Sequence, residues 1–504
     1  MEHDPPVSKC MTSDRTSFAH PSARTRWPAI ITSAIDDMHR SVAALPSSAP
    51  ADKVCEGKRI VADLAALKYE LQHDRALIPL ELEPQQGSNG DDLALYNEEL
   101  AQREQLSKTK QLRWHDVEWL FSECYLYRRM ANLFSRSAHW RDYDVFARQK
   151  TQTFRSSRPA VLELAARYRE IVQRIRESAV AAPVEGSASS DSAKPDEAVV
   201  KEAERVLFEE MAEICLWGNA TDLSLLTTLS YEDIQKLQGS EAKKGREEKV
   251  LVNQLQEAFE VLWQAKQEGK QNRRVDFVLD NAGFELYVDL VLAGYLLETG
   301  LATEVVMHPK SIPWFVSDVI PKDLEQLLEV MRDPRGFYEG GADEEQQQKQ
   351  ATAPLGQKEE EDVKFLFEHW ATLHAEGQLI LRPNRFWTHP GSFWRLPHVE
   401  PVLFEDMKEA ELTVFKGDLN YRKLVGDANW DPTTPFQEAI GPLGKSSGLR
   451  TLALRTCKGD VVVGLPKGKD EELRALPGGG GDSGAREWAF NGKWAVVQFS
   501  DGKA

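Results

Sequence analysis

The sequence predicts an α/β protein: a Rossmann-like, mostly parallel sheet with helices on both faces, plus a helical N-terminal domain. Three observations lead to this fold class. Roughly the first 180 of the 504 residues show helical periodicity without competing strand patterns. After Val199, short apolar runs alternate with helical patterns. Hydrophobic residues make up 41% of the chain, which is enough to build a sizeable core.

The N-terminal part is predicted to be helical. Apolar residues recur every three or four positions, with charges between them, in Arg59–His73, Trp114–Ser135 and Ala160–Ser178. The segment Ala179–Ala198 is rich in Ala, Ser, Pro and acidic residues and has no aromatic residue, so we expect a flexible linker. The helical region is therefore expected over residues 1–198 and the α/β domain over residues 199–504. We expect the helical region to act as a lid that excludes water from the site.

Strands and helices alternate in the second part of the chain. The expected helices are Glu202–Leu216, Leu251–Lys266, the segment after Gly283 through Leu297, and Leu324–Met331. The expected strands are Val275–Leu279, Glu304–Met307, Leu412–Phe415, Thr451–Leu454, Val461–Val463 and Trp494–Phe499. Two polar or glycine-rich segments, near 340–362 and 476–485, are expected to be surface insertions. Ligands of such sheets bind beyond the carboxyl ends of the strands.

Charge and cysteine content exclude several classes of function. The net charge is −18, from 62 basic and 80 acidic residues, which disfavours a nucleic-acid binder or an anionic-membrane binder. The five cysteines are scattered and form no Cys-x-x-Cys, so a disulfide scaffold or zinc-cysteine site is not expected. The longest apolar stretch, Leu286–Leu297, is interrupted by Asp289 and is too short to span a bilayer. We expect a cytoplasmic protein, with the nucleus as a second compartment, and the sequence leaves its oligomeric state open.

Acidic and amide side chains follow two of the expected strands. Asp280 and Asn281 come directly after the strand at 275–279, and Asp318 follows the strand at 304–307. Their oxygens suit a hard divalent cation such as Mg²⁺ or Mn²⁺. The alternative is that these residues cap the helices that follow, and the spacing alone does not separate the two interpretations. Glu285 and Asp289 lie four residues apart, on one face of the next helix.

Cationic residues follow two further strands. Lys416–Lys423, after the strand at 412–415, combines cations, an acid, an amide and a phenol, and we expect a polar binding loop there. Lys458 follows the strand at 451–454 and could clamp a phosphate. Two acids and an amide can hold a cation, and these cations can hold the anion that it attracts. The combination favours metal-assisted phosphoryl transfer to water.

At these residues the sequence resembles the metal-dependent damage-control phosphatases, formerly domain of unknown function 89, in the subfamily with an Arg-Thr-x-Lys signature. The resemblance covers nearly the whole chain. The matching words are RTRWPAIIT (24–32), LWGNATDLSLL (216–226), DFVLDNAGFELYVDL (276–290), PWFVSDV (313–319), FWTHPGSFW (386–394), FKGDLNYRKLVGD (415–427) and RTCKGDVVVGL (455–465).

The resemblance implies roles for individual residues. It implies a metal held by Asp280, Asn281 and Asp318, and catalytic roles for Asp280, Asp318 and Lys458. It further implies a substrate site whose members are Asp280, Asn281, Glu285, Asp418, Leu419, Asn420, Tyr421, Arg422 and Lys458. Asn219 and Asp222 match a Gly-Asn-x-x-Asp-Leu motif without an evident role.

The resemblance also implies an activity. It points to hydrolysis of small sugar phosphates, such as fructose 1-phosphate and fructose 6-phosphate, supported by Mn²⁺, Co²⁺, Ni²⁺ or Mg²⁺. One alternative is an S-adenosylmethionine-dependent protein-glutamate carboxyl O-methyltransferase, although the sequence has no glycine-rich strand-turn-helix followed by an acidic ribose partner. A second alternative is a non-catalytic protein that binds phosphorylated metabolites.

Overall fold

A computed structural model describes residues 3–82, 89–107, 111–180, 197–218, 248–340 and 353–503. Its centre is a seven-stranded sheet in the order β1-β7-β6-β5-β2-β3-β4. All neighbouring pairs are parallel except β6 and β7, which are antiparallel. The strands are β1 (Val250–Asn253), β2 (Arg274–Val278), β3 (Glu304–His308), β4 (Leu379–Leu381), β5 (Leu412–Lys416), β6 (Arg450–Thr456) and β7 (Ala495–Asp501). The predicted fold class, a mostly parallel sheet with helices on both faces and a helical N-terminal region, is confirmed.

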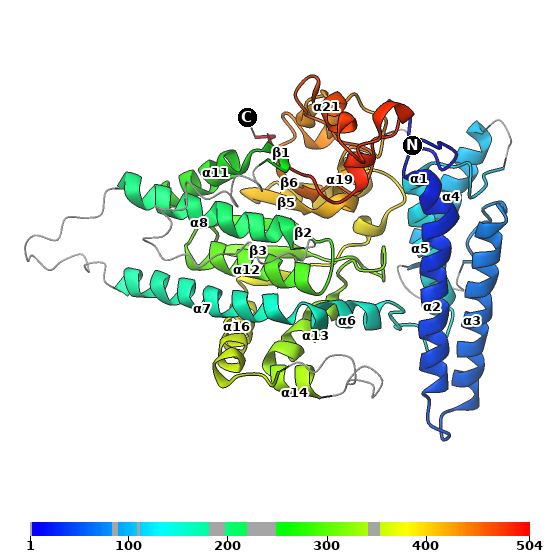
Figure 1. The fold of residues 1–504 in the computed structure, drawn as a ribbon, viewed down its shortest axis with the longest axis horizontal. Coiled ribbons are helices and arrows are strands. Elements are labelled where there is room, and N and C mark those ends of the chain that lie inside the picture. Colours follow the sequence, from blue (N-terminus) through cyan, green and yellow to red (C-terminus); the bar gives the residue numbers. More distant parts are fainter. Residues whose placement is uncertain are drawn as a thin grey trace, which may run out of the picture.

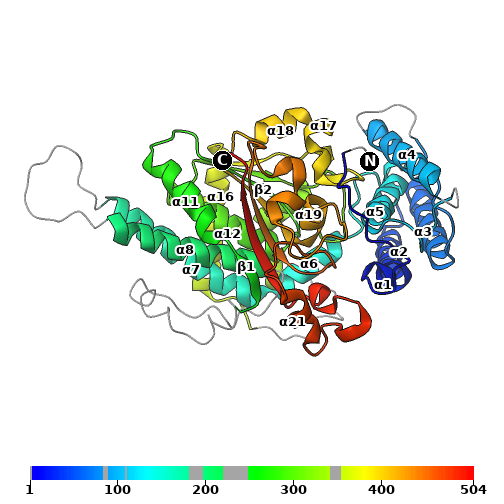
Figure 2. The same ribbon diagram turned by 90° about the horizontal axis from the view of Figure 1, so that it is seen from above.

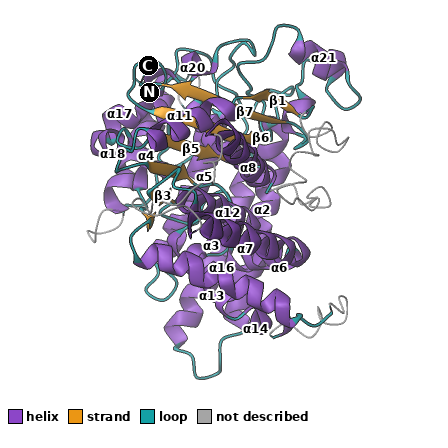
Figure 3. Ribbon diagram, turned by 90° about the vertical axis from the view of Figure 1, so that its left-hand side faces the viewer, coloured by secondary structure: helices purple, strands orange, loops and turns teal. Residues whose placement is uncertain are grey.

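Helices cover both faces of this sheet (Figure 3). On one face an apolar cluster joins β2, β3 and β5 to α7, α8, α11, α12, α13 and α16. On the other face a second cluster joins the sheet to α17–α21 and to the loops between them. The helices of the α/β part are α8 (Glu197–Trp217), α11 (Leu255–Gln267), α12 (Phe284–Glu298), α13 (Pro321–Arg332), α14 (Pro334–Glu339), α16 (Gln357–Ala375), α17 (Leu396–Val399), α18 (Pro401–Met407), α19 (Gly417–Leu424), α20 (Phe436–Ala439) and α21 (Lys469–Ala475).

The first N-terminal helices stand beyond one end of the strands, with α2, α3 and α5 running across the strand direction, whereas α7 runs along the sheet (Figure 1; seen from above in Figure 2). The helices of this region are α1 (Ala19–Pro21), α2 (Trp27–Ala43), α3 (Ala51–Gln72), α4 (Asn89–Leu106), α5 (Trp119–Ser135), α6 (Ala147–Ser156) and α7 (Arg158–Val180). Their own apolar cluster includes Trp314, from the loop after β3, and Leu419, from α19. The helical layer therefore packs on segments that follow the carboxyl ends of β3 and β5.

The apolar clusters also show how the two parts of the chain share their cores. Residues of α2 to α5 belong to the N-terminal cluster. By contrast, Phe154 of α6 and the buried apolar residues of α7, from Ala160 to Val172, pack in the cluster of the sheet. The division into units at residues 1–198 and 199–504 stays a prediction about independent folding.

Several expected elements differ from the structure. Val461–Val463 is buried but forms no strand, because its backbone groups bond to side chains: Arg455 Nη1 donates to the Val461 carbonyl, and the Val463 N–H donates to the Tyr421 hydroxyl. Residues 251–253, expected at the start of a helix, belong instead to β1, which pairs with β7. The short edge strand β4 was missed. Residues 416–423, expected to be a binding loop, form the last residue of β5 and most of the buried helix α19. The expected insertion near 340–362 ends in a helix, since α16 begins at Gln357.

Within the part of the chain that the structure describes, no helix is both long enough and apolar enough to cross a membrane.

Candidate active site

The loops after β2 and β3 are joined by backbone pairing. The Ala282 N–H donates to the Ser317 carbonyl at 2.7 Å, and the Val319 N–H donates to the Asp280 carbonyl at 2.7 Å. Asn281 and Asp318 consequently form an isolated antiparallel bridge. Two neighbouring parallel strands end at the same edge of a sheet, which is why Asn281 and Asp318, 37 positions apart, meet here. Asp280, Asn281 and Asp318 lie together at this edge.

The alternative role of these residues as helix caps is wrong. The N-cap of α12 is Gly283, which has φ +72°, and no side chain caps that helix. The N-cap of α13 is Ile320, whose N–H donates to Asp323 Oδ2 at 2.8 Å. Asp280, Asn281 and Asp318 are therefore left for other contacts.

Asp280 lies directly against the start of α19. Gly417 has φ +79°, and a Cβ placed on it would lie 1.9 Å from Asp280 Oδ2. Only glycine allows both this backbone conformation and this approach. The Asn281 amide nitrogen donates to Asp280 Oδ2 at 2.8 Å and to Glu285 Oε2 at 2.7 Å. Its oxygen accepts from the Ser317 hydroxyl at 2.5 Å.

A lysine that the sequence analysis did not single out lies between the two loops. Lys310 is fully buried, and its Nζ lies 3.1 Å from Asp318 Oδ2 and donates to the Leu279 carbonyl at 2.6 Å. Its third neighbour is Asn420 Oδ1, at 3.4 Å. The available signal was its position two residues after the buried strand β3, at the same sheet edge as Asp280.

A second buried ion cluster lies behind the first. Lys416 Nζ is 2.9 Å from Asp289 Oδ1, 3.2 Å from Glu285 Oε1 and 3.0 Å from the Cys215 carbonyl. The Cys215 thiol donates to Asp289 Oδ1 at 2.9 Å. Burial raises the pKa of Asp289 to about 6, although Lys416 acts in the opposite direction. Glu285 therefore bridges Lys416 and the Asn281 amide, which connects the two clusters.

The carboxylates around Asp280 repel one another. Burial, together with Glu285 and Asp318, raises the pKa of Asp280 well above its ordinary value, and Lys310 and Lys458 oppose this effect. Burial likewise raises the pKa of Asp318 to about 6, although Lys310 lowers it. Three acids in one buried place create a strong demand for added positive charge.

Asp418 holds the segment that carries Lys458. Its Oδ1 accepts from Arg455 Nε at 2.8 Å and from the backbone N–H of Lys458 at 2.9 Å, and Arg455 Nη2 lies 2.7 Å from the same oxygen. Burial favours the neutral acid, but Arg455, with Arg422, outweighs it and the pKa of Asp418 is lowered. The Lys458 side chain itself is partly exposed.

The residues at 419–422, for which the family resemblance implies substrate contacts, bond and pack within the protein. The Asn420 amide donates to the carbonyls of Val278, Leu279 and Lys416. Tyr421 donates to Gln498 Oε1 at 2.8 Å. Leu419 packs in the N-terminal cluster.

Arg422 connects α19 to the N-terminal helices. It makes two hydrogen bonds to Asp427, at 2.9 and 2.8 Å, and one to Glu123 Oε2, at 3.1 Å. Its guanidinium carbon lies 3.6 Å from the Trp119 ring centroid. A guanidinium held by two carboxylates and a ring is fixed in place. The helical layer is therefore anchored beside the candidate site.

The oxygen donors at this edge fit a hard divalent cation. Within the described ranges, no three His, Cys, Asp or Glu side chains form a metal-binding group. The donor set of Asp280, Asn281 and Asp318 contains two acids and one amide, and these are the oxygen types that Mg²⁺ and Mn²⁺ prefer. Asp318 Oδ2 is buried and makes no hydrogen bond of good geometry in the described structure, despite the nearby ammonium of Lys310. Asn219 and Asp222 lie outside the described residues.

Comparison with known proteins extends over almost the whole chain. The family described as the damage-control phosphatase ARMT1-like domain matches residues 22–473. Among proteins named damage-control phosphatase ARMT1, the one from Xenopus laevis is 32% identical over 501 residues, covering 99% of each chain. The one from Homo sapiens is 30% identical over 491 residues, covering 96% of this chain and 97% of its own. A crystal structure of a DUF89 family protein from Pyrococcus horikoshii aligns over 94% of this chain and 98% of its own, with 15% identity and a TM-score of 0.33.

Proposed function

Because the chain belongs to the ARMT1-like family of damage-control phosphatases, we propose that it is a divalent-metal-dependent phosphatase that hydrolyses small phosphorylated metabolites. We further propose sugar phosphates, including fructose 1-phosphate and fructose 6-phosphate, as its substrates. The family resemblance seen in the sequence motifs is confirmed by the match over residues 22–473. The activity and the substrates rest on the site, and on the names of the relatives.

One observation carries the proposal: acids and cations gather at the carboxyl edge of the sheet in the arrangement that phosphoryl transfer needs. Asp280 and Asp318 are brought together by the paired loops after β2 and β3. Burial and the neighbouring acids raise the pKa of Asp280, and the charge of Lys458, together with that of Lys310, opposes this rise. A phosphate group placed between the acids and Lys458 would need a cation on the acidic side and an ammonium on the other.

Asp280, Asn281 and Asp318 are the residues that would hold the metal. When bound, a divalent cation neutralises phosphate oxygens and lowers the pKa of a coordinated water. Lys310 partly neutralises Asp318 from the protein side, and Glu285 fixes the Asn281 amide. These two contacts orient the donor set before any ligand arrives.

Lys458 is the residue that would bind the phosphate. Its backbone N–H is fixed by Asp418, and the Asp418 carboxylate is fixed in turn by Arg455. The side chain is partly exposed and can reach a ligand, whereas Arg455 is fully buried and cannot. An ammonium here stabilises the charge on the transferred phosphoryl group.

The test is release of inorganic phosphate by purified, metal-stripped protein. The assay supplies Mn²⁺, Co²⁺, Ni²⁺ or Mg²⁺ with a panel of sugar phosphates, and compares Asp280→Asn with the exposed-site control Asp482→Asn. We expect metal-dependent release that Asp280→Asn lowers at least 100-fold and Asp482→Asn leaves unchanged. No release by folded protein with any of the four metals would contradict the proposal, and binding of sugar phosphate without release would favour a non-catalytic binding protein.

A further inference from the structure

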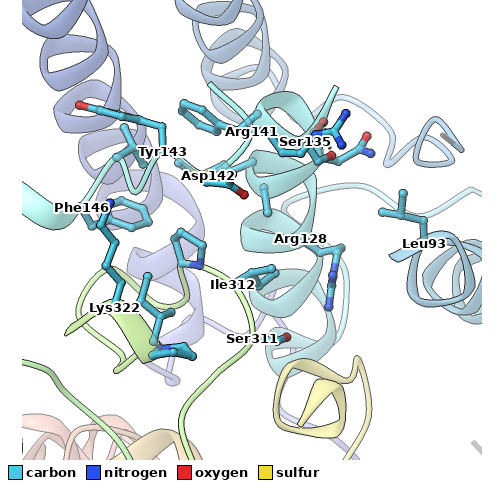
Figure 4. A pocket seen from close by; sticks show the side chains of 18 residues that line it. Leu93, Arg128, Ser135, Arg141, Asp142, Tyr143, Phe146, Ser311, Ile312 and Lys322 are labelled. Carbon is cyan, nitrogen blue, oxygen red and sulfur yellow. Dashed lines mark hydrogen bonds between the residues drawn. The ribbon is translucent and has the colours of Figure 1, made fainter. Parts of the chain in front are cut away.

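A cavity lies between α5 and the loop that carries Asp318. Its volume is about 350 Å³, within the range of small-molecule sites. One wall comes from α5 and the segment that follows it, including Met130, Phe134 and Phe146. The opposite wall comes from the two ends of the loop between β3 and α13. Figure 4 shows the side chains from both walls around the same space. Asp280, Asp318 and Lys458 are not among its lining residues.

The lining is mostly apolar inside, where the buried polar residues Arg128 and Asn132 also contribute, and it is cationic at the rim. Met130, Phe134, Val145 and Phe146 are buried, and they present only carbon and sulfur side-chain atoms to the interior. Arg141 and Lys322 are exposed lining residues and lie at the rim; Asp142 is the one acid among the described residues of the lining.

This rim differs in sign from the protein as a whole. The chain has a net charge of −18, yet Arg128, Arg141 and Lys322 outnumber the single acid of the lining. Arg128 is already engaged, because its Nη2 donates to Thr388 Oγ1 at 2.8 Å and lies 3.6 Å from Asp92. Arg141 and Lys322 have no ion pair within the described part of the chain. An apolar interior with cations at its mouth selects a ligand that has an apolar body and an anionic end.

The cavity touches both ends of the loop that holds Asp318. Ser311–Pro313 line it from the start of the loop, and Ile320–Lys322 line it from the end. Between them, Phe315 and Val316 have φ values of +43° and +72°, a conformation that costs free energy for non-glycine residues. An occupant would therefore contact both ends of a strained loop.

We propose that this cavity binds a small anion with an apolar body, and that its occupant changes the order of the loop that carries Asp318. The carboxylate or phosphate end contacts Arg141 and Lys322, and the apolar body contacts the wall of α5. The binding and the change in loop order do not depend on which substrate the active site takes.

Binding is measured by calorimetry of the full chain, with octanoate as the probe and octanol and octylammonium as comparisons. We expect saturable binding of one octanoate, and at least tenfold weaker binding of the other two. Arg141→Glu/Lys322→Glu and the cavity-filling Ser135→Trp should each weaken octanoate binding at least tenfold. Lys493→Glu, an exposed charge reversal elsewhere, should leave it unchanged. Octanoate that does not bind, or binds all four proteins equally, overturns the site.

The loop arm measures backbone hydrogen exchange in the presence of saturating octanoate. We expect the exchange rates of residues 311–322 to fall at least threefold, while those of α3, which does not line the cavity, stay unchanged. Binding with unchanged exchange in 311–322 overturns the coupling to the loop. Because neither readout uses turnover, failure of this inference is separate from failure of the proposed phosphatase activity.

Discussion

Asp280 and Gly417 make a contact that no residue other than glycine permits at position 417. The Asp280 carboxylate occupies the place where a Cβ on Gly417 would stand, 1.9 Å from Oδ2. A glycine thus follows strand β5 directly, because Asp280, two residues after the end of β2, needs that space. This contact fixes the first acid of the candidate site against the first turn of α19.

Replacing Gly417 by alanine should displace Asp280. The added methyl group collides with the carboxylate and the backbone is held at φ +79°, so we expect activity to fall at least 100-fold and the free energy of unfolding to drop by about 2 kcal/mol or more. Urea unfolding and phosphate release measure the two effects.

Gly468→Ala is the matched control for that variant. Gly468 has φ +86°, but no atom of the described residues lies within 4 Å of an added Cβ. It should show the backbone strain alone, with normal activity. Equal activity loss in both variants would mean that the contact with Asp280 is unimportant.

Lys310→Met should destabilise the protein through Asp318. The change leaves a buried carboxylate without its cation, 3.1 Å away in the native structure, and we expect a loss of ~3–5 kcal/mol. Adding Asp318→Asn to Lys310→Met should recover part of this loss, since the amide needs no counter-charge. Denaturant unfolding of the wild type, Lys310→Met, Asp318→Asn and the double variant gives the coupling energy between the two residues. Additive losses of stability would contradict a direct ion pair.

Lys458 and Asp418 should separate activity from stability. Lys458→Met should lower kcat/KM about 100-fold with little change in Tm, because the side chain is partly exposed and supports no buried contact. Asp418→Asn should lower Tm clearly, because Arg455 then lacks its buried counter-charge. The measurements are phosphate release and thermal unfolding. A stable Asp418→Asn protein with strongly raised KM would instead support the substrate contact implied by the family resemblance.

Asp460 should make the stability depend on pH. Burial raises its pKa to about 6 from an ordinary 3.8, although Ser17 and Phe18 donate hydrogen bonds to it. Because the folded pKa lies above the unfolded one, the ionised carboxylate disfavours the fold above about pH 6, and this cost disappears as the pH falls towards 3.8.

Asp460→Asn should therefore raise Tm more at pH 8 than at pH 4.5. The pKa shift corresponds to about 1–3 kcal/mol at the higher pH. Thermal unfolding of the wild type, Asp460→Asn and the exposed control Asp482→Asn at both pH values measures the difference. A Tm gain of the same size at both pH values would show that ionisation of Asp460 is not its cause.

The sequence by itself determined the order of the elements and the edge of the sheet where the site lies. Short apolar runs mark β2, β3, β5 and β6, since buried parallel strands are apolar on both faces. Polar residues directly after two neighbouring strands must meet, and Asp280 and Asp318 do. The sequence motifs likewise identified the family, because they occur in the same order along the chain.

Only the tertiary structure decided what each polar side chain contacts. Asp418, Asn420 and Arg422 look like ligand-binding residues in a loop, but α19 turns them towards Arg455, the strand carbonyls and Glu123. Lys310 and Lys416 became visible as partners of Asp318 and Asp289 only once distant segments were folded together. The physical reason is that strand and helix patterns are local, whereas a buried charge is satisfied by whichever opposite charge the folded chain brings within about 3 Å.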